Sequence, residues 1–539
     1  MSMGTMALAA EGDVKLSVKD PVEGHKYSYL QLFVGDLSED KTTLSNVKWG
    51  ANVAGSITYK EKANAEATEY TVTKTLNPTA GQAVPAAVLD YLANLSGELT
   101  IANTISAWVT GDGTEIPAAG VNVPKGYYVI KDAYTDPNAD QTTTLSTNVV
   151  QIVGPTEITP KAGTTEHKKE VLDVNDTTET AINLDNLIGV ETWVKSADHD
   201  IGDKVPFKLT TKIGSDFAKY NSYYLAVSDT LGAGLTLNQD SVKVYVDGKL
   251  ATKGEAAGNY SLTVSGQTFK VEFTKLNGNT NAAAGKDVVI VYTATLNTSA
   301  VIGNPGNPNK SYAEFSNNPN DNQEGKGKTP EDTVVVFTYK TDVDKVDPKG
   351  AALSGAGFTL YKKYNAAVTG KTNVAGTTPA GAKADTFPTG EFWYEVKTIA
   401  ATTAGTSFAF EGIDDGTYIL VESTTPNGYN TIDPITLIVT ATHGADATST
   451  TKYSVSAITT GNDDFKADAK GGEVKFTKKD KSEKELTTGE IYSEIINQSG
   501  TVLPSTGGIG TTIFYVVGSI LVVAAGVLLI TKKRMGREG

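Results

Sequence analysis

The sequence contains no cysteine among its 539 residues. Disulfide bonds, thiol catalysis and cysteine-based metal sites are therefore excluded, and a secreted chain of this composition must gain stability in another way. The four histidines are far apart, and none lies in an HExxH or similar metal-ligand spacing. P-loop and GxSxG patterns are missing as well. We therefore expect no active site for an external substrate, no metal site and no cofactor.

A surplus of basic residues is also missing. The chain has 47 Lys and Arg residues against 62 Asp and Glu residues, which gives a net charge of −15. A surface that binds phosphates needs clustered Lys and Arg, so nucleic acid is not expected as a partner. The length predicts roughly three or four domains of ~150 residues each.

The two ends of the chain carry targeting signals. Residues 1–10, MSMGTMALAA, end in small residues, as does the cleavage region of a secretory signal peptide, but a charged start and a long apolar stretch are missing. We interpret them as a signal peptide remnant, with a disordered N-terminus as the alternative. Residues 513–530 form an uncharged apolar run that is long enough for a transmembrane helix. The basic tail, residues 531–539, is then cytoplasmic and the preceding chain lies outside the cell.

A five-residue motif stands directly before the apolar run, in the segment 501–512. Its residues are Leu503, Pro504, Ser505, Thr506 and Gly507. The order of LPxTG motif, apolar span and basic tail resembles the cell-wall sorting signal of Gram-positive surface proteins. The resemblance implies that a sortase attacks the carbonyl carbon of Thr506, releases the chain from Gly507 onward and passes Thr506 to an amine. The membrane anchor is then transient, and an ordinary single-span membrane protein is the disfavoured alternative.

The remainder of the chain has the composition of β-structure. Residues 241–246 (SVKVYV), 287–293 (DVVIVYT) and 333–339 (TVVVFTY) are rich in Val, Tyr and Thr, and clusters of Gly, Asn, Asp and Pro separate such stretches. This pattern predicts an all-β protein of antiparallel sandwiches. Apolar positions at helical spacing predict one helix over residues 85–96.

Two linkers divide this β-rich part. They lie at residues 154–166 and 317–330 and consist mainly of Pro, Gly and small or polar residues. The second linker is rich in oxygen-bearing side chains but lacks the spacing of a calcium-binding loop, so we interpret it as a solvated turn. The predicted domains are residues 11–160, 161–330 and 331–500.

Several segments resemble the backbone pilins of Gram-positive sortase-assembled pili. They are SYLQLFVGDLSEDKTTLSNVKWG in the first domain, VPFKLTTKI, VSDTLGAGLTLNQDSVKVYVDG and YAEFSNNPND in the second, and VDKVDPKGAALSGAGFTLYKK and GTYILVESTTPNGYN in the third. The resemblance implies an N-terminal pilin domain, an isopeptide-forming middle domain and a SpaA-type, Cna-B-like domain. It thus implies tandem immunoglobulin-like, Cna-like β-sandwiches.

In such domains a buried Lys amine attacks an Asn carboxamide, an Asp or Glu assists, and ammonia leaves. Burial disfavours charge, so it lowers the pKa of the Lys and raises the pKa of the acid. For the third domain we predict a crosslink between Lys345 and Asn497, assisted by Glu422. The two linked residues lie in the first and last strands, so the bond would clamp the whole domain.

For the middle domain we predict a crosslink between Lys169 and Asn317, assisted by Asp229. Lys169 shares a strand face with Val171, which favours it over the competing Lys168. The alternation of Ala313, Phe315 and Asn317 likewise favours Asn317 over Asn318.

The first domain offers Lys15 and Lys19 near its start and Asn148 near its end, but no matching acid motif. We predict no crosslink there.

A pilus also needs an acceptor amine on each subunit. In the resembled family this Lys ends a short motif at the junction of the first two domains. The junction here reads EITPK and ends in Lys161, with Thr159 in place of the usual Tyr. Joining Thr506 of one copy to Lys161 of the next makes a head-to-tail contact, and such contacts propagate into open filaments.

The sequence therefore predicts a secreted structural subunit of a covalent pilus, finally joined to peptidoglycan of the cell wall and supporting adhesion. Sortase, further copies of the chain and peptidoglycan are the expected partners, with accessory pilins and host surface ligands as additional candidates. The alternative is a wall-anchored adhesin or ancillary pilin that is joined through Thr506 alone. A secreted hydrolase with sandwich modules is disfavoured, because no pair of carboxylates stands out as a catalytic acid and base.

Overall fold

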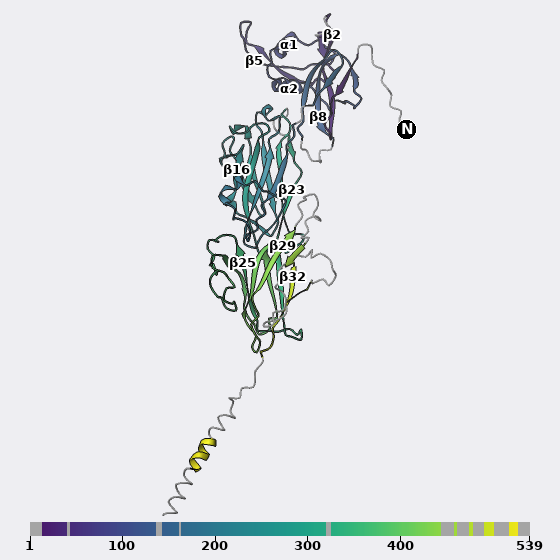
Figure 1. Cartoon of the computed structure of the whole chain (residues 1–539). Helices are drawn as coiled ribbons and strands as arrows, with labels where there is room; N and C mark the ends of the chain where they lie inside the picture. Colours follow the sequence, from purple (N-terminus) through teal and green to yellow (C-terminus); the bar gives the residue numbers. More distant parts are fainter. Residues whose placement is uncertain are drawn as a thin grey trace, which may run out of the picture.

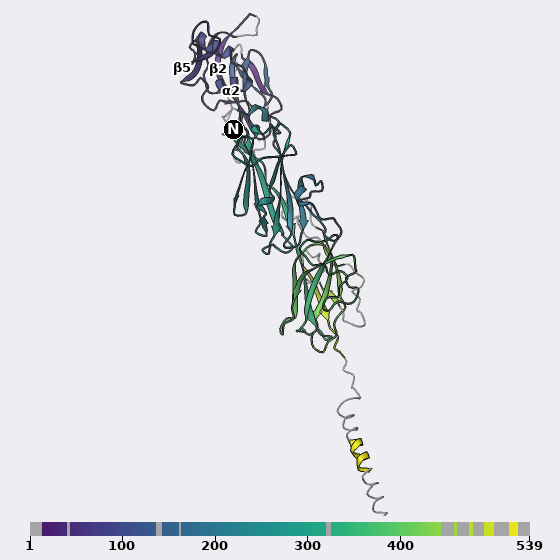
Figure 2. The same cartoon turned by 90° about the vertical axis from the view of Figure 1, so that its left-hand side faces the viewer.

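The structure is a computed structural model that describes residues 13–39, 44–135, 143–160, 163–319, 325–442, 457–460, 474–477, 490–500 and 517–525. Three β-rich domains follow one another along an elongated molecule (Figures 1 and 2). The mostly β character and the division into several sheet-containing domains agree with the prediction.

The first domain combines two sheets, a hairpin and two helices. The long strand β2 is its central element, because β3, β6 and β8 all pair with it. Leu30 and Leu32 of β2 are fully buried in a core that also contains Trp49, Val88 and Trp108. The elements are β1 (Val14–Val18), β2 (His25–Leu37), β3 (Leu44–Trp49), β4 (Ile57–Lys62), β5 (Tyr70–Leu76), α1 (Ala86–Ala93), α2 (Glu98–Ser106), β6 (Thr114–Glu115), β7 (Val121–Val123), β8 (Gly126–Tyr134), β9 (Thr147–Ile152) and β10 (Thr156–Ile158).

The predicted helix is present but shorter than expected. Helix α1 follows Pro85, a residue that is well tolerated at a helix start, and Val88 is buried. Helix α2 was not predicted. Its sequence, ELTIANTIS, is rich in Thr, Ile and Asn, which have modest intrinsic helix propensity, so tertiary packing decides its conformation.

The middle domain consists of two sheets around one core. The first has the order β11-β13-β20-β16-β17, and the second has the order β12-β23-β21-β14-β19-β18. Both contribute to a single hydrophobic cluster. The strands are β11 (His167–Val171), β12 (Ser196–Asp198), β13 (Lys204–Lys212), β14 (Leu225–Leu231), β15 (Leu235–Leu237), β16 (Lys243–Val246), β17 (Lys249–Leu250), β18 (Ser261–Ser265), β19 (Thr268–Phe273), β20 (Asp287–Leu296), β21 (Asn307–Ser316), β22 (Lys326–Lys328) and β23 (Asp332–Phe337).

The boundary between the middle and third domains lies beyond the predicted position at residue 330. Strand β23 pairs with β12 and β21, both of the middle domain. Part of the predicted linker is also a strand, since β22 pairs with β21. The polar sequence Lys326–Lys328 gives no hydrophobic signal for this strand, because only its glycine is buried.

The third domain again has two sheets, with the orders β27-β24-β32-β31 and β26-β25-β28-β29-β30. Its first strand, β24, pairs in parallel with its last strand, β32. The strands are β24 (Tyr339–Val346), β25 (Gly357–Tyr364), β26 (Phe392–Ile399), β27 (Ser407–Ile413), β28 (Gly416–Thr424), β29 (Ile435–Thr442), β30 (Ala457–Thr460), β31 (Val474–Thr477) and β32 (Glu490–Ile496).

Several predicted features lie outside the described residues: residues 1–10, Lys161, the motif from Leu503 to Gly507, and residues 531–539. Of the predicted span at 513–530, the structure describes residues 517–525, which are helical. Among the helices in the described ranges, none is long and apolar enough to cross a membrane.

Candidate functional site: buried lysine clusters

The third domain buries one Lys, one Asn and one Glu together, and they are the three residues that the sequence predicted. Lys345 and Asn497 are fully buried, and Glu422 is nearly so. The parallel pairing of β24 with β32 sets Lys345 opposite Ile495, and the backbone N–H of Asn497 donates to the carbonyl of Val346 at 3.1 Å. The first strand and the end of the last strand therefore meet at this cluster.

The contacts within this trio have the geometry of an amine facing a carboxamide. Lys345 Nζ donates to Asn497 Oδ1, and Asn497 Nδ2 donates to Glu422 Oε1 at 2.8 Å. Lys345 Nζ lies 3.5 Å from the same Glu422 oxygen. The other Glu422 oxygen accepts the backbone N–H of Ile432 at 3.0 Å, which fixes the carboxyl group in place.

Burial makes this Lys a better nucleophile than a solvated one. The low-polarity surroundings lower the pKa of Lys345 to about 8, although the charge of Glu422 opposes the change. A larger fraction of the amine is therefore unprotonated at neutral pH than for a Lys in water. An unprotonated amine can react with a neighbouring carboxamide to form a new amide and release ammonia. Here a carboxyl group holds the carboxamide in place.

The middle domain contains a second buried cluster around Lys169. Strands β11 and β20 of one sheet supply Lys169 and Tyr292, and strand β14 of the facing sheet supplies Asp229. Lys169 Nζ contacts Asp229 Oδ2 and donates to the Tyr292 hydroxyl at 3.1 Å. That hydroxyl donates to Asp229 Oδ2 at 2.9 Å. Lys168 instead projects outward, where it pairs with Glu170.

The carboxamide at this cluster belongs to Asn309 and not to Asn317. Asn309 is fully buried, and its Nδ2 donates to the Tyr292 hydroxyl at 2.8 Å. Within the described part of the chain, neither Asn309 Oδ1 nor Asp229 Oδ1 has a hydrogen-bond partner. The site therefore offers an amine, a carboxamide and a carboxyl group, and one oxygen atom each of the carboxamide and the carboxyl group can still form a hydrogen bond.

Asn317 lies directly after the other end of β21, and its prediction is corrected. Its Nδ2 donates to the Tyr134 hydroxyl of the first domain at 3.2 Å, and its carbonyl accepts the N–H of Leu145. Asn309 lies in β21 and Asn317 one residue beyond its end, and a separation of eight residues in extended chain corresponds to roughly 27 Å. Side-chain alternation predicted which face of the strand carries the crosslinked asparagine. Which residue along that face it is follows only from the pairing of β14 with β21.

Burial shifts the acid and the base of this cluster in opposite directions. It lowers the pKa of Lys169, against the charge and hydrogen bond of Asp229. It raises the pKa of Asp229, against the charge of Lys169. Both shifts favour the neutral pair of amine and carboxylic acid. A neutral acid can donate a hydrogen bond to a carboxamide oxygen and so polarise it.

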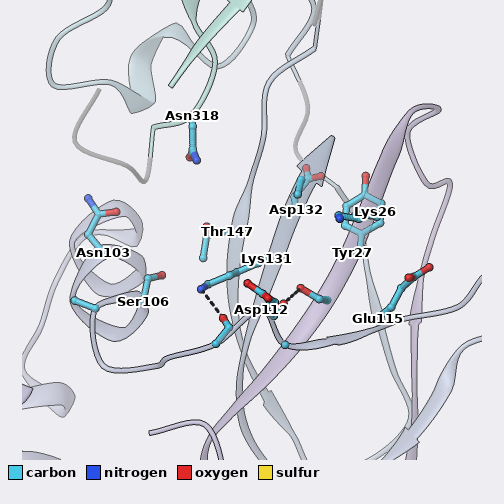
Figure 3. Close-up of a pocket in the computed structure, with 15 residues that line it drawn as sticks. Lys26, Tyr27, Asn103, Ser106, Asp112, Glu115, Lys131, Asp132, Thr147 and Asn318 are labelled. Atoms are coloured by element: carbon cyan, nitrogen blue, oxygen red, sulfur yellow. Dashed lines mark hydrogen bonds between the residues drawn. The ribbon is translucent and has the colours of Figure 1, made fainter. Parts of the chain in front are cut away.

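The first domain has no comparable cluster among its described residues. Lys15 and Lys19 are exposed, and Asn148 is half-buried in β9, opposite Ile130 of β8. A polar pocket of about 750 Å³ lies between the first and middle domains (Figure 3). Asp112, Lys131 and Asp132 line it from one domain and Asn318 from the other (Figure 3). None of the residues of the two lysine clusters lines it.

Three segments match known protein families. Residues 201–319 match the Gram-positive pilin backbone subunit 2, Cna-B-like domain. Residues 340–454 match the SpaA prealbumin-like fold domain, and residues 495–535 match the LPXTG cell wall anchor motif. The matches cover the two domains that hold the lysine clusters and the end of the chain.

The chain is also similar to individual proteins. It is 28% identical over 384 residues to the trypsin-resistant surface T6 protein of Streptococcus pyogenes serotype M6, and the aligned region covers 62% of this chain and 65% of that relative. The chain thus spans less than two thirds of this curated relative's length.

Among solved structures, the T6 backbone pilin of the same serotype, described as a modular three-domain structure, has a TM-score of 0.51 at 18% identity, over 91% of this chain and 98% of that chain. The full-length major pilin SpaD from Corynebacterium diphtheriae has a TM-score of 0.44 at 17% identity, over 91% and 98%. The T6 likeness shows a shared fold. The three matched segments show that the chain carries a Gram-positive pilin backbone subunit 2, Cna-B-like domain, a SpaA prealbumin-like fold domain and an LPXTG cell wall anchor motif.

Proposed function

We propose that the chain is the structural subunit of a covalently polymerised pilus. A sortase joins Thr506 of one copy to Lys161 of the next, and the last copy is joined to peptidoglycan of the cell wall. Residues 513–530 hold the chain in the membrane as a helix until it is cut. The domains act as tandem immunoglobulin-like, Cna-like β-sandwiches that stabilise themselves by internal amide bonds.

The observation that carries this proposal is the cluster of Lys345, Asn497 and Glu422. It joins the two ends of the third domain directly before the sorting motif. A subunit that transmits tension through its own backbone needs such a connection, because an amide bond does not break when strands are pulled apart. In the middle domain we assign the corresponding bond to Lys169 and Asn309, assisted by Asp229 and by the Tyr292 hydroxyl.

Polymerisation is tested with wall extracts of cells that produce the wild-type chain or the variant Lys161→Ala. We expect a ladder of high-molecular-weight bands for the wild type and a single wall-linked species for the variant. Lys168→Ala is the matched control, because this Lys is exposed in the strand that follows the linker. A ladder that survives Lys161→Ala refutes the acceptor. Wild type without a ladder supports the alternative of a wall-anchored adhesin that is not polymerised.

The internal bonds are tested separately by intact-mass measurement. Each bond lowers the mass by one ammonia, about 17 Da, so the ectodomain should weigh about 34 Da less than its sequence. A mass equal to that of the unmodified sequence would refute both bonds, whatever the outcome for Lys161.

A further inference from the structure

A third buried lysine, Lys362, lies where the middle and third domains meet. It lies near the end of β25 in the third domain, and its side chain is fully buried. Its Nζ donates to Asp414 of its own domain at 2.5 Å, and to Asp200 and Asp176 of the middle domain at 2.7 and 3.1 Å. An ammonium group has three N–H donors, so each of them has a carboxylate partner.

The two domains approach closely around this ammonium group. The backbone N–H of Asp414 donates to Asp200 Oδ1 at 3.0 Å, and that of Asp415 donates to Asp198 Oδ2 at 3.0 Å. The N–H of Ile201 donates to the carbonyl of Gly412 at 2.9 Å, and a Cβ atom at Gly412 would come within 2.6 Å of the Ile201 side chain. The junction is therefore packed through both main chain and side chains.

Carboxylates outnumber cations at this junction. Four of them, on Asp176, Asp200, Asp203 and Asp414, have oxygen atoms within 4.8 Å of one another. The titratable and charged groups that act on the cluster are Asp173, Asp176, Asp198, His199, Asp200 and Asp203 of the middle domain, and Tyr339, Lys362, Tyr364, Asp414, Asp415 and Tyr418 of the third. His199 Nε2 forms a hydrogen bond with the backbone carbonyl of Leu172 at 2.9 Å. One ammonium group therefore faces several aspartates, and burying their excess negative charge is costly.

Protons can remove this excess. Burial raises the pKa of Asp203 to about 6, and the negative charge of the neighbouring Asp200 is the second-largest cause of this rise. Burial likewise raises the pKa of Asp415 to about 7, with the negative charge of Asp198 as the second-largest cause. Burial also lowers the pKa of Lys362, but the charges of Asp200 and Asp414 outweigh it and hold that pKa well above the usual value. Lys362 thus stays charged throughout the neutral range while some of the aspartates change their charge.

We propose that the junction between the middle and third domains is a proton-dependent lock. Lys362 holds the two domains together by binding carboxylates of both. Protonation of the surplus aspartates tightens the junction, and their full ionisation loosens it. The pilus rod is therefore stiffer at this joint in mildly acidic surroundings than in alkaline ones.

Proton linkage gives the sign of this pH dependence. An aspartate whose pKa is higher in the closed junction than in the open one, where water reaches it, binds protons more strongly when the junction is closed. Its stabilising effect is complete below the ordinary value near 3.8 and is lost as the pH rises through about 6 for Asp203 and about 7 for Asp415. The opposing requirement that Lys362 be charged is met until strongly alkaline pH.

Two spin labels on the full-length chain test this proposal, by the width of the distance distribution between them. Because the chain has no cysteine, Glu255→Cys in the middle domain and Lys397→Cys in the third, both exposed, become the only labelling sites. We expect a narrow distribution at about pH 5 and a broad one at about pH 8.5. A second pair within the third domain, Lys371→Cys with Lys397→Cys, should stay narrow and so reports that the domain remains folded.

Three variants distinguish the lock from a junction that is held by packing alone or by a metal ion. Lys362→Met should broaden the interdomain distribution at both pH values, whereas Lys363→Met should behave as wild type, because Lys363 is partly exposed and pairs with Glu391 within the third domain. Asp203→Asn removes one surplus charge and should keep the distribution narrow at about pH 8.5. A wild-type width that does not change with pH, or that Lys362→Met does not alter, overturns the proposal. A width that depends on added Ca²⁺ and on EDTA overturns it as well, because the aspartates would then hold a metal ion.

Discussion

Lys169 and Lys345 each face one carboxyl group and lie in a cluster with a carboxamide. Lys362 faces three carboxylates and, within the described part of the chain, contacts no carboxamide. All three side chains are fully buried. Burial alone lowers the pKa of a Lys, and this effect prevails at Lys169 and Lys345. At Lys362 the surrounding negative charges prevail and raise the pKa. The number of nearby carboxylates thus separates the two Lys residues with a lowered pKa from the one with a raised pKa.

Glu422 should be essential for the bond in the third domain. In the variant Glu422→Gln the carboxyl group that holds the Asn497 amide is lost, so Lys345 should remain free and the intact mass, after correction for the substitution, should lie about 17 Da above that of the wild type. The crosslink closes a loop across a sequence separation of 152 residues, and its loss should lower the free energy of unfolding by about 5 kcal/mol in the chain-entropy description. Glu411→Gln, an exposed position in β27, is the control and should keep the same loss of ammonia as the wild type. An unchanged mass in Glu422→Gln would show that the acid is not needed.

The choice between Asn309 and Asn317 is settled by the same measurement. Asn309→Ala should raise the mass of the ectodomain by one ammonia over the wild type after correction for the substitution, because the amide at the Lys169 cluster is then gone. Asn317→Ala should leave the crosslink intact and remove the side-chain contact with Tyr134. The opposite pattern would restore Asn317 as the crosslinked residue.

At the scale of strands, side-chain alternation explains what could be predicted from the sequence. Lys169 and Val171 share a face of β11, and the structure buries both. The third-domain trio could be found because each member lies in a recognisable segment. Asn309 could not, because alternation does not reveal which residue of a long strand stands opposite a given partner. That requires the register between β14 and β21, where Asp229 pairs with Ser311.

Lys362 was missed although the same rule applies to it. Phe358, Leu360 and Lys362 alternate along β25, and the first two belong to the hydrophobic core. The pattern alone suggests that Lys362 points inward. Its partners come from another domain, and packing between domains leaves no periodic signal in a single sequence.

His167 connects the two sheets of the middle domain and should make that domain sensitive to acid. Its ring nitrogens bond Thr211 of β13 at 2.9 Å and Ser311 of β21 at 2.8 Å. Burial, and then the charge of Lys169, lowers the pKa of His167 to about 3. The neutral ring therefore stabilises the fold fully above the ordinary value of 6.5, and this contribution is lost as the pH falls toward 3, by on the order of 5 kcal/mol.

Hydrogen exchange of β11, β13 and β21 between about pH 6.5 and about pH 4 measures this loss. The variant His167→Gln does not titrate and should remove the dependence, while the exposed substitution Lys168→Gln should retain it. Equal protection of the three strands across that range in the wild type would contradict the assignment.

At the scale of the whole molecule, the domains stand in a row and the chain runs from one end of the row to the other (Figure 1). With Thr506 of one copy joined to Lys161 of the next, as proposed, tension between neighbouring subunits passes through the middle and third domains in series and bypasses the first. In the third domain the proposed bond joins β24, where the chain enters, to the residue after β32, where it leaves. Tension would bypass the intervening strands. In the middle domain the bond ends at Asn309, so β21 and β23 remain in the path of the force.

This difference predicts how the two domains respond to stretching of a single molecule. The wild-type third domain should not extend, whereas Asn497→Ala should release a segment of about 500 Å, given the 152-residue separation from Lys345 and roughly 3.4 Å per residue. The wild-type middle domain should release only the short stretch after Asn309, and Asn309→Ala should release most of the domain. Force spectroscopy of the ectodomain measures both lengths. If the wild-type third domain unfolded to the same length as Asn497→Ala, no covalent connection would bridge its ends, and the rod would depend on hydrogen bonds alone to resist tension.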